Sequence, residues 1–204
     1  EVGGDYYDFL SAGPGKIGVV VADVAGSDVE AAEYTTMGKH VLRTYARECD
    51  SPAEVLTKTN DLICEDMRTE MFISLFYGVI DVANKTLRYA NAGCEPPIHY
   101  SASERRPSLL IADGILLGIK SGMSYQERQI GLGRGDVLVL YTDGLTEAEI
   151  DSRRFGTQAV MQAVSQLARR SAQQIADGIH DALHEFVHGR ITDDVAVVVL
   201  KVVG

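Results

Sequence analysis

The first third of the chain combines one continuous apolar run with two helical patterns. Residues 16–24, KIGVVVADV, are mostly β-branched, which is typical of a strand that is covered on both faces. Over 27–48 the apolar residues recur at helical spacing. A second helix is predicted over 52–69, with Ser51 as its N-cap and Pro52 in its first position.

The rest of the chain reads as a series of strands, then two helices and a last strand. Most of the connections between the strands are short, with Asn84-Lys85 at one turn, so neighbouring strands should be antiparallel. The predicted strands cover 71–81, 86–93, 97–101, 107–111, 125–131, 136–142 and 193–202, and the helices cover 156–169 and 171–188.

The order of these elements predicts the fold class. The chain lacks the strand–helix alternation of a doubly wound parallel sheet. Two antiparallel sheets, each with a helix pair outside it, would bury every apolar run. We therefore expect an α+β fold, a four-layer α-β-β-α sandwich of two antiparallel sheets flanked by helix pairs. The length fits a single domain over residues 1–204.

Aspartates recur where the predicted strands begin or end. Asp5 follows two glycines, Asp23 ends the 17–24 strand, Asp143 ends the 137–141 strand, and Asp193 and Asp194 open the last strand. A single such acid is usually a turn or cap residue. If the strands are neighbours, however, the carboxylates converge and repel one another unless cations lie between them. Oxygen ligands favour hard ions such as Mg²⁺ or Mn²⁺.

Composition and charge narrow the function classes. The net charge of −10 argues against binding to nucleic acid or to an anionic membrane surface. Three widely spaced cysteines indicate neither a disulfide framework nor a CxxC metal site, which favours the cytoplasm. We find no signal peptide and no membrane-spanning run. Because the chain begins at Glu1 without a methionine, we interpret it as a fragment of a longer protein with an upstream sensor domain.

Five motifs carry a resemblance that covers nearly the whole chain. EVGGDYYDF, VVADVAG, FYGVID…LRYANAG, LVLYTDGLTEA and TDDVAVVVL occur in this order. The chain resembles the metal-dependent PPM (type 2C) serine/threonine phosphatases, and within them the bacterial SpoIIE/RsbU-like branch. The resemblance implies an α-β-β-α sandwich with a metal centre that holds two Mn²⁺ or Mg²⁺ ions.

The resemblance also implies a role for each acid. Asp23 would bridge the two metal ions, and the carbonyl of Val24 would bind one of them. Asp143 and Asp193 would complete the protein ligands of the other ion, and Asp5 would lie on the side of the first, directly or through water. Asp8 and Asp194 are expected to support the ligands rather than bind metal.

The implied reaction is hydrolysis of phosphoserine or phosphothreonine by a water that the two metal ions activate, without a phosphoenzyme. By resemblance, the substrate would be a phosphorylated anti-sigma-factor antagonist, a small STAS-type domain. Its dephosphorylation would release a sigma factor in a partner-switching pathway.

The chain departs from the family pattern at Ser27 and Cys94, where histidines are common, at Asp28, where a glycine is common, and at Ala196, which replaces a threonine. These departures keep open a second hypothesis, a catalytically silent phosphatase-like module that binds and regulates. The complete set of mutually repelling acids argues against it, because a silent site has no need of them.

Two further motifs could indicate other functions. HEFVH, residues 184–188, matches the HExxH signature of zinc peptidases, but on a helical wheel its histidines lie opposite the apolar face and should face solvent. Arg105 and Arg106 form a basic pair, which is usually a solvated loop and in the alternative could dock phosphate. A cysteine phosphatase is excluded because no arginine lies six residues after any cysteine.

Overall fold

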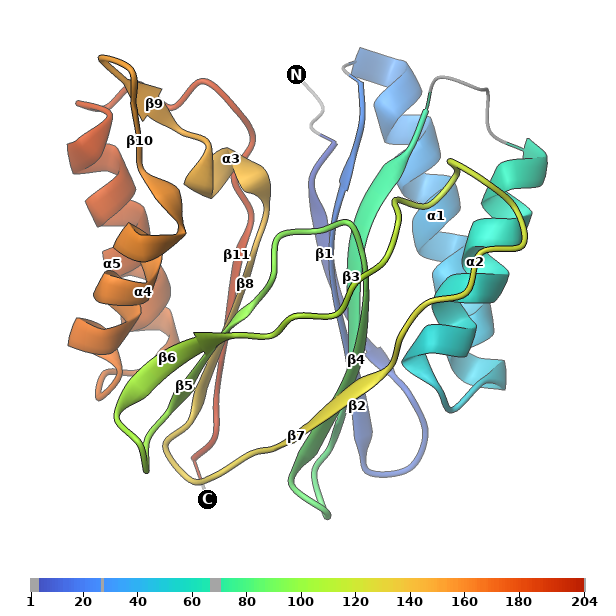
Figure 1. Cartoon of the computed structure of the whole chain (residues 1–204), viewed down its shortest axis with the longest axis horizontal. Helices are drawn as coiled ribbons and strands as arrows, with labels where there is room; N and C mark the ends of the chain where they lie inside the picture. Colours follow the sequence, from blue (N-terminus) through green and yellow to red (C-terminus); the bar gives the residue numbers. More distant parts are fainter. Residues whose placement is uncertain (1–3, 27, 67–70, 204) are drawn as a thin grey trace. The chain divides into compact units, whose positions relative to one another are not determined.

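A computed structural model describes residues 4–26, 28–66 and 71–203 of the chain. The chain divides into two compact units. The N-terminal unit consists of Glu1–Cys94 and Ile111–Gly131, and the C-terminal unit of Glu95–Leu110 and Leu132–Gly204. Each unit contains one large antiparallel sheet with a pair of helices packed on it, as Figure 1 shows for each.

The sheet of the N-terminal unit has five strands in the order β1-β2-β3-β4-β7. The predicted burial on both faces is confirmed for the middle of β2, where consecutive residues are buried although their side chains point to opposite faces. In the sheet, β2 lies between β1 and β3. The strands are β1 (Tyr6–Ser11), β2 (Lys16–Val24), β3 (Ile73–Asp81), β4 (Thr86–Ala92) and β7 (Arg128–Gly131).

Helices α1 (Asp28–Glu48) and α2 (Pro52–Asp66) pack side by side against this sheet. Helix α2 begins as the sequence predicts, since the Ser51 hydroxyl accepts a hydrogen bond from the Glu54 N–H at 3.3 Å. The helices and the sheet share one apolar core. It includes Val20, Ala22, Leu42, Val55, Leu56, Ile63, Leu75 and Tyr77.

The sheet of the C-terminal unit has four strands in the order β11-β8-β5-β6. Its centre is β8, which is buried at all five positions. The strands are β5 (Ile98–Ser101), β6 (Arg106–Leu109), β8 (Val137–Tyr141) and β11 (Val197–Lys201). A small hairpin of β9 (Glu149–Ile150) and β10 (Arg153–Arg154) forms a separate two-stranded ladder.

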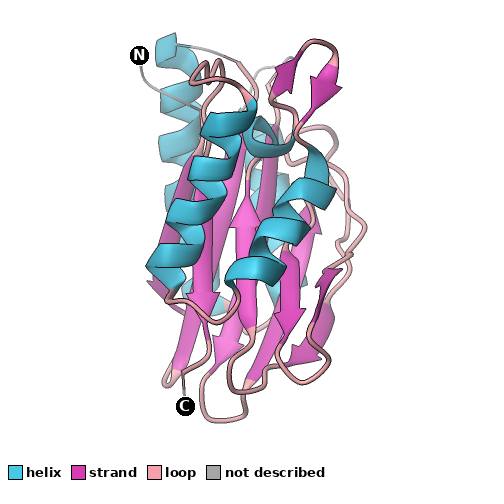
Figure 2. Cartoon of the chain, turned by 90° about the vertical axis from the view of Figure 1, so that its left-hand side faces the viewer, coloured by secondary structure: helices cyan, strands magenta, loops and turns pink. Residues whose placement is uncertain are grey.

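Three helices belong to the C-terminal unit: α3 (Asp143–Thr146), α4 (Gly156–Leu167) and α5 (Ala172–Phe186). Figure 2 shows α4 and α5 in front of the strands that they cover. Ser171 and Gln174 form a reciprocal capping box that fixes the start of α5. Helix α5 buries one stripe of side chains at helical spacing, namely Ile175, Ile179 and Leu183.

The predicted α+β class with two large antiparallel sheets is confirmed by these ladders, while the stacking into four layers stays a prediction. The last strand begins at Val197 rather than at Asp193, because the backbone of 193–196 forms a loop. The sequence analysis did not predict β1, α3 or the β9–β10 hairpin. None of the helices in the described part of the chain is long and apolar enough to cross a membrane.

Candidate functional site

In the C-terminal unit, Asp143 lies where the buried strand β8 gives way to the single turn of α3. The loop before β11 is fastened to the same point. The Thr142 Oγ1 accepts a hydrogen bond from the Ala196 N–H at 2.9 Å, and the Thr142 N–H donates to the Ala196 carbonyl at 3.2 Å. These two bonds hold the segment that carries Asp193 beside Asp143.

Gly144 makes this approach possible. A Cβ atom there would clash with the backbone carbonyl of Asp194 and would lie 3.5 Å from the Cβ of Asp193. The Asp193 carboxylate is exposed, and its Oδ1 accepts a hydrogen bond from the Asp194 N–H at 2.9 Å. A side chain at position 144 would push the acidic loop away from the end of β8.

Negative charge accumulates around Asp143. Although its side chain reaches the surface, partial burial and then the charges of Glu147 and Asp193 raise its pKa above the ordinary value. Burial, followed by the charges of Asp143 and Glu147, also raises the pKa of Glu95. Arg154 pairs with Glu147, with 2.8 Å between its Nη1 and the Glu147 Oε1, yet burial and the neighbouring carboxylates still raise the pKa of Asp143.

Glu95 and Glu147 were not among the predicted site residues. Glu147 stands four residues after Asp143, so the single turn of α3 places both on one side. Glu95 follows the Asn91–Cys94 turn, and its proximity to Asp143 depends on the pairing of β5 with β8. The spacing of Asp143 and Glu147 was the one signal available in the sequence.

In the N-terminal unit, Gly4, Asp23 and Val24 lie together. A Cβ atom on Gly4 would be 2.6 Å from the Val24 carbonyl oxygen and 3.1 Å from the Asp23 Oδ1. The Val24 N–H donates to the Gly4 carbonyl at 3.3 Å. Asp5 is the next residue, directly before β1, and both Asp5 and Asp23 are half-buried. Gly4 thus lets the segment with Asp5 run against the end of β2.

Asp8 has a different neighbour from the other acids. Side chains alternate along a strand, and Asp8 lies on the face of β1 that meets α1. Its two carboxylate oxygens accept hydrogen bonds from the Arg43 Nε at 2.6 Å and Nη2 at 2.8 Å. Burial opposes ionisation of Asp8, but the bonds from Arg43 and the nearby Lys39 outweigh it and lower the pKa. Asp8 therefore joins the sheet to the helix.

The donor sets in the two units suit a hard cation, because they consist of carboxylate and carbonyl oxygens. Within the residues that the structure describes, no three histidine, cysteine or acidic side chains are gathered closely enough to hold a metal ion. The full ligand set of Asp5, Asp23, Val24, Asp143 and Asp193, with Asp8 and Asp194 in support, therefore stays a prediction.

The HExxH motif lacks the geometry of a zinc peptidase. Helix α5 ends at Phe186, and His188 has a φ of 51°, so the helix does not carry both histidines of the motif. His184 and His188 are exposed, and His180 stacks on His184 with 6.2 Å between the ring centroids. The prediction that these histidines face solvent is confirmed.

Two of the departures from the family pattern can be placed. The Cys94 N–H donates to the Asn91 Oδ1 at 2.8 Å, and the Asn91 Nδ2 donates to the Cys94 carbonyl at 2.8 Å, so the backbone of this turn is fixed without a histidine. Ala196 still binds Thr142 through its backbone. Ser27 lies outside the described residues, as does the side chain of Asp28.

Comparison with known proteins gives one family and several related proteins. Residues 13–203 match the family described as stage II sporulation protein E (SpoIIE). The phosphoserine phosphatase RsbU of Bacillus subtilis is 31% identical over 152 residues, which cover 74% of this chain and 45% of RsbU. The chain thus spans about half or less of the length of the curated relatives that it matches.

Solved structures show which fold the chain has. The RsbU and RsbW domains of Rv1364c from Mycobacterium tuberculosis match with a TM-score of 0.81 and 25% identity, over 97% of this chain and 55% of that one. The SiaA-PP2C domain of Pseudomonas aeruginosa matches with a TM-score of 0.86 and 18% identity, over 98% and 80%. The catalytic domain of the serine/threonine phosphatase PstP, solved with two manganese ions, has a TM-score of 0.68 and 16% identity, over 100% and 93%. The chain therefore belongs to the SpoIIE family and has the fold of PP2C phosphatase domains.

Proposed function

We propose that this chain is the catalytic domain of a Mn²⁺- or Mg²⁺-dependent protein phosphatase that hydrolyses phosphoserine or phosphothreonine. The observation that carries the proposal is the acidic end of β8, where burial and then the charges of Glu147 and Asp193 disfavour ionisation of Asp143. A divalent cation relieves this repulsion. In a member of the SpoIIE family, such a group is best explained as part of a metal centre.

The residues of each unit would have distinct tasks. Asp143 and Asp193 would hold a cation at the end of β8, and Asp23, Asp5 and the Val24 carbonyl would supply oxygens from the N-terminal unit. Two bound ions would supply an activated water and offset negative charge on the phosphoryl group. Gly4 and Gly144 would position the ligands by allowing close backbone approach, and Thr142 would fix the acidic loop.

We extend the proposal to the substrate and its setting. Relatives named RsbU and RsbP are phosphoserine phosphatases, and RsbU and RsbW domains occur together in the Rv1364c structure. These names favour a phosphorylated protein of a partner-switching pathway, and we propose that this protein is a STAS-type anti-sigma-factor antagonist. An upstream sensor domain and a cytoplasmic location belong to the same proposal.

Hydrolysis of p-nitrophenyl phosphate tests the central proposal. The wild-type chain would be assayed with EDTA, Mg²⁺, Mn²⁺ and Zn²⁺ separately, beside Asp23→Ala, Asp143→Asn and the matched control Asp151→Asn. Asp151 is exposed and has a φ of 50°, which asparagine tolerates. We expect activity with Mn²⁺ or Mg²⁺ that falls by about a hundredfold or more in the two site variants but not in the control.

Thermal unfolding with and without Mn²⁺ gives a readout that does not need turnover. A cation that binds the folded state raises the Tm of the wild-type chain, and this shift should be lost in Asp143→Asn. Full Mn²⁺-dependent hydrolysis by Asp23→Ala would contradict the proposed role of Asp23 in the metal centre. A Tm shift without hydrolysis of either p-nitrophenyl phosphate or a phosphoserine STAS domain would favour the silent binding module instead.

A further inference from the structure

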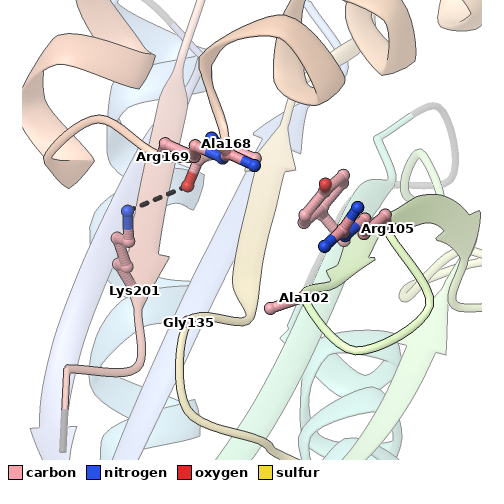
Figure 3. Close-up of a pocket in the computed structure, with 7 residues that line it drawn as sticks. Ala102, Arg105, Gly135, Ala168, Arg169 and Lys201 are labelled. Atoms are coloured by element: carbon pink, nitrogen blue, oxygen red, sulfur yellow. Dashed lines mark hydrogen bonds between the residues drawn. The ribbon is translucent and has the colours of Figure 1, made fainter.

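The C-terminal unit has a pocket of about 350 Å³ that the proposed reaction does not use. It lies where β5 and β11 end and β8 begins, beside the linker between α4 and α5 (Figure 3). Its lining consists of Tyr100, Ala102, Arg105, Gly135, Ala168, Arg169 and Lys201. All of these residues belong to one compact unit.

Three cations from three different elements surround this pocket. Arg105 comes from the β5–β6 turn, Arg169 from the α4–α5 linker and Lys201 from the end of β11 (Figure 3). Arg105 and Arg169 are exposed, and neither forms an ion pair or hydrogen bond with any part of the chain that the structure describes. Both guanidinium groups therefore keep their full set of donors for a ligand.

The third cation is fixed in place. The Lys201 ammonium donates to the Ala168 carbonyl at 2.8 Å and also to the Arg170 carbonyl. These bonds cap the carbonyl end of α4, where a positive charge is favourable. They also hold the linker that carries Arg169 against β11. Lys201 thus contributes charge and position to the pocket.

Hydrogen bonds also fix the opposite wall of the pocket. Gly135 has a φ of +88°, its N–H donates to the Val202 carbonyl at 2.9 Å, and a Cβ there would be 3.1 Å from the Cβ of Ala102. The Asp136 carboxylate beneath it accepts hydrogen bonds from the N–H groups of Ala102 and Gly133, each at 2.9 Å. The turn that carries Arg105 is therefore anchored to the start of β8.

The charge of the pocket is opposite to that of the chain. The net charge is −10, yet the lining contains three cationic side chains and no carboxylate. Asp136, the nearest buried acid, has its charge compensated by two backbone donors and by His99. Planar guanidinium groups suit phosphate or carboxylate oxygens because they can donate two parallel hydrogen bonds.

The pocket is also separate from the acidic end of the sheet. Gly135 precedes β8 and Asp143 follows it, so seven residues of mostly extended chain lie between them, a span of about 25 Å. We propose that this pocket is a second ligand site that binds a small polyvalent oxyanion, with Arg105 and Arg169 as its donors and Lys201 as a fixed charge.

Calorimetric titration of EDTA-treated, metal-free protein tests this proposal with two probes. Inorganic pyrophosphate represents ligands that carry phosphate, and citrate represents ligands that carry carboxylates. The proteins are the wild-type chain, Asp143→Asn, Arg105→Gln and Arg169→Gln. Arg153→Gln is the matched control, because it removes the same charge from an exposed strand of the same unit.

We expect saturable binding of at least one probe to the wild-type chain, weakened by about tenfold or more in Arg105→Gln and in Arg169→Gln. Binding should be unchanged in Arg153→Gln and in Asp143→Asn, and should weaken with added NaCl. Hydrolysis of p-nitrophenyl phosphate by Arg105→Gln should match the wild type. The preferred probe identifies the ligand class. Absence of saturable binding, or equal affinity in all arginine variants, would overturn the proposal.

Discussion

Replacing Asp136 with alanine should destabilise the chain because one carboxylate holds three donors. Its Oδ1 accepts from the Ala102 N–H, and its Oδ2 accepts from the Gly133 N–H and contacts the His99 Nε2, each at 2.9 Å. The Asp136 side chain is only 6% exposed, so water cannot easily replace it. Alanine would leave three partly buried donors without their acceptor.

The size of the effect follows from this geometry. A buried donor without a partner costs about 1 kcal/mol or more, and removing one member of a buried charged network costs about 3–5 kcal/mol. We therefore expect Asp136→Ala to lower the free energy of unfolding by about 3 kcal/mol. In a domain of this size such a loss corresponds to a fall in Tm of about 10 °C.

The dependence on pH has a definite sign. Burial opposes ionisation of Asp136, but the hydrogen bonds from Ala102, Gly133 and His99 outweigh it and lower the pKa below the ordinary 3.8. A carboxyl whose pKa is lowered by folding stabilises the folded state above its unfolded pKa, and this contribution is lost as the pH falls through the folded pKa. The contribution of the Asp136 carboxylate to the stability difference between wild type and Asp136→Ala should therefore shrink as the pH falls below about 4.

Urea unfolding followed by far-ultraviolet circular dichroism measures this difference, since the chain has no tryptophan to report by fluorescence. Asp81→Ala is the matched control. Asp81 also accepts two hydrogen bonds from one neighbour, Asn84, but in an exposed turn, so its loss should matter much less. Equal midpoints for wild type and Asp136→Ala at pH 7, or a difference that does not shrink below about pH 4, would refute the reasoning.

Three further predictions concern the acidic end of β8 and helix α5. Gly144→Ala should displace the Asp194 carbonyl and lower both the Tm and the Mn²⁺-dependent activity. Gly131→Ala is the control and should be tolerated, because a Cβ there would meet no atom within 4 Å. Wild-type kinetics in Gly144→Ala would contradict the close approach of the Asp194 backbone to Gly144. Ile179→Ala should lower the free energy of unfolding by about 2–5 kcal/mol because Ile179 is fully buried, as urea titration would show. His184→Ala should keep the stability and the phosphatase activity of the wild type. A loss of activity in this variant would contradict the interpretation of the histidines as solvent-facing and without a catalytic role.

The sequence predicted those elements whose pattern is long. The β-branched run predicts β2, and the helical spacing of apolar residues predicts α1 and α5. Burial of one side of a regular element makes apolar residues recur with the period of that element. Strand β1 escaped prediction, since its six residues alternate weakly and it is ordered by its pairing with β2. Helix α3 has a single turn, which is too short to show a period.

Some residues of the candidate site were also predictable from the sequence, and others were not. Asp143 and Asp193 were identifiable from motifs, and the fold brings them into electrostatic contact. Glu95 was missed because its approach to Asp143 arises from the pairing of β5 with β8, which no local pattern encodes. The sequence offered Arg105, with Arg106, as a possible contact for phosphate, but the rest of the basic pocket was missed for a similar reason. Arg105, Arg169 and Lys201 are far apart in the sequence, and the sheet with its helix linker assembles them.

Strand β8 thus carries opposite charges at its two ends, acids at Asp143 and cations around Gly135. The Debye length at physiological ionic strength is about 8 Å, whereas about 25 Å of chain separates these ends. Direct electrostatic coupling between a cation at one end and an oxyanion at the other should therefore be negligible in physiological salt. Any effect of an anion in the pocket on phosphatase activity would have to pass through a shift of β8 itself. All five residues of β8 are buried and paired with β11, and three of them are also paired with β5. Because such a shift would repack the sheet, we expect the two sites to act independently.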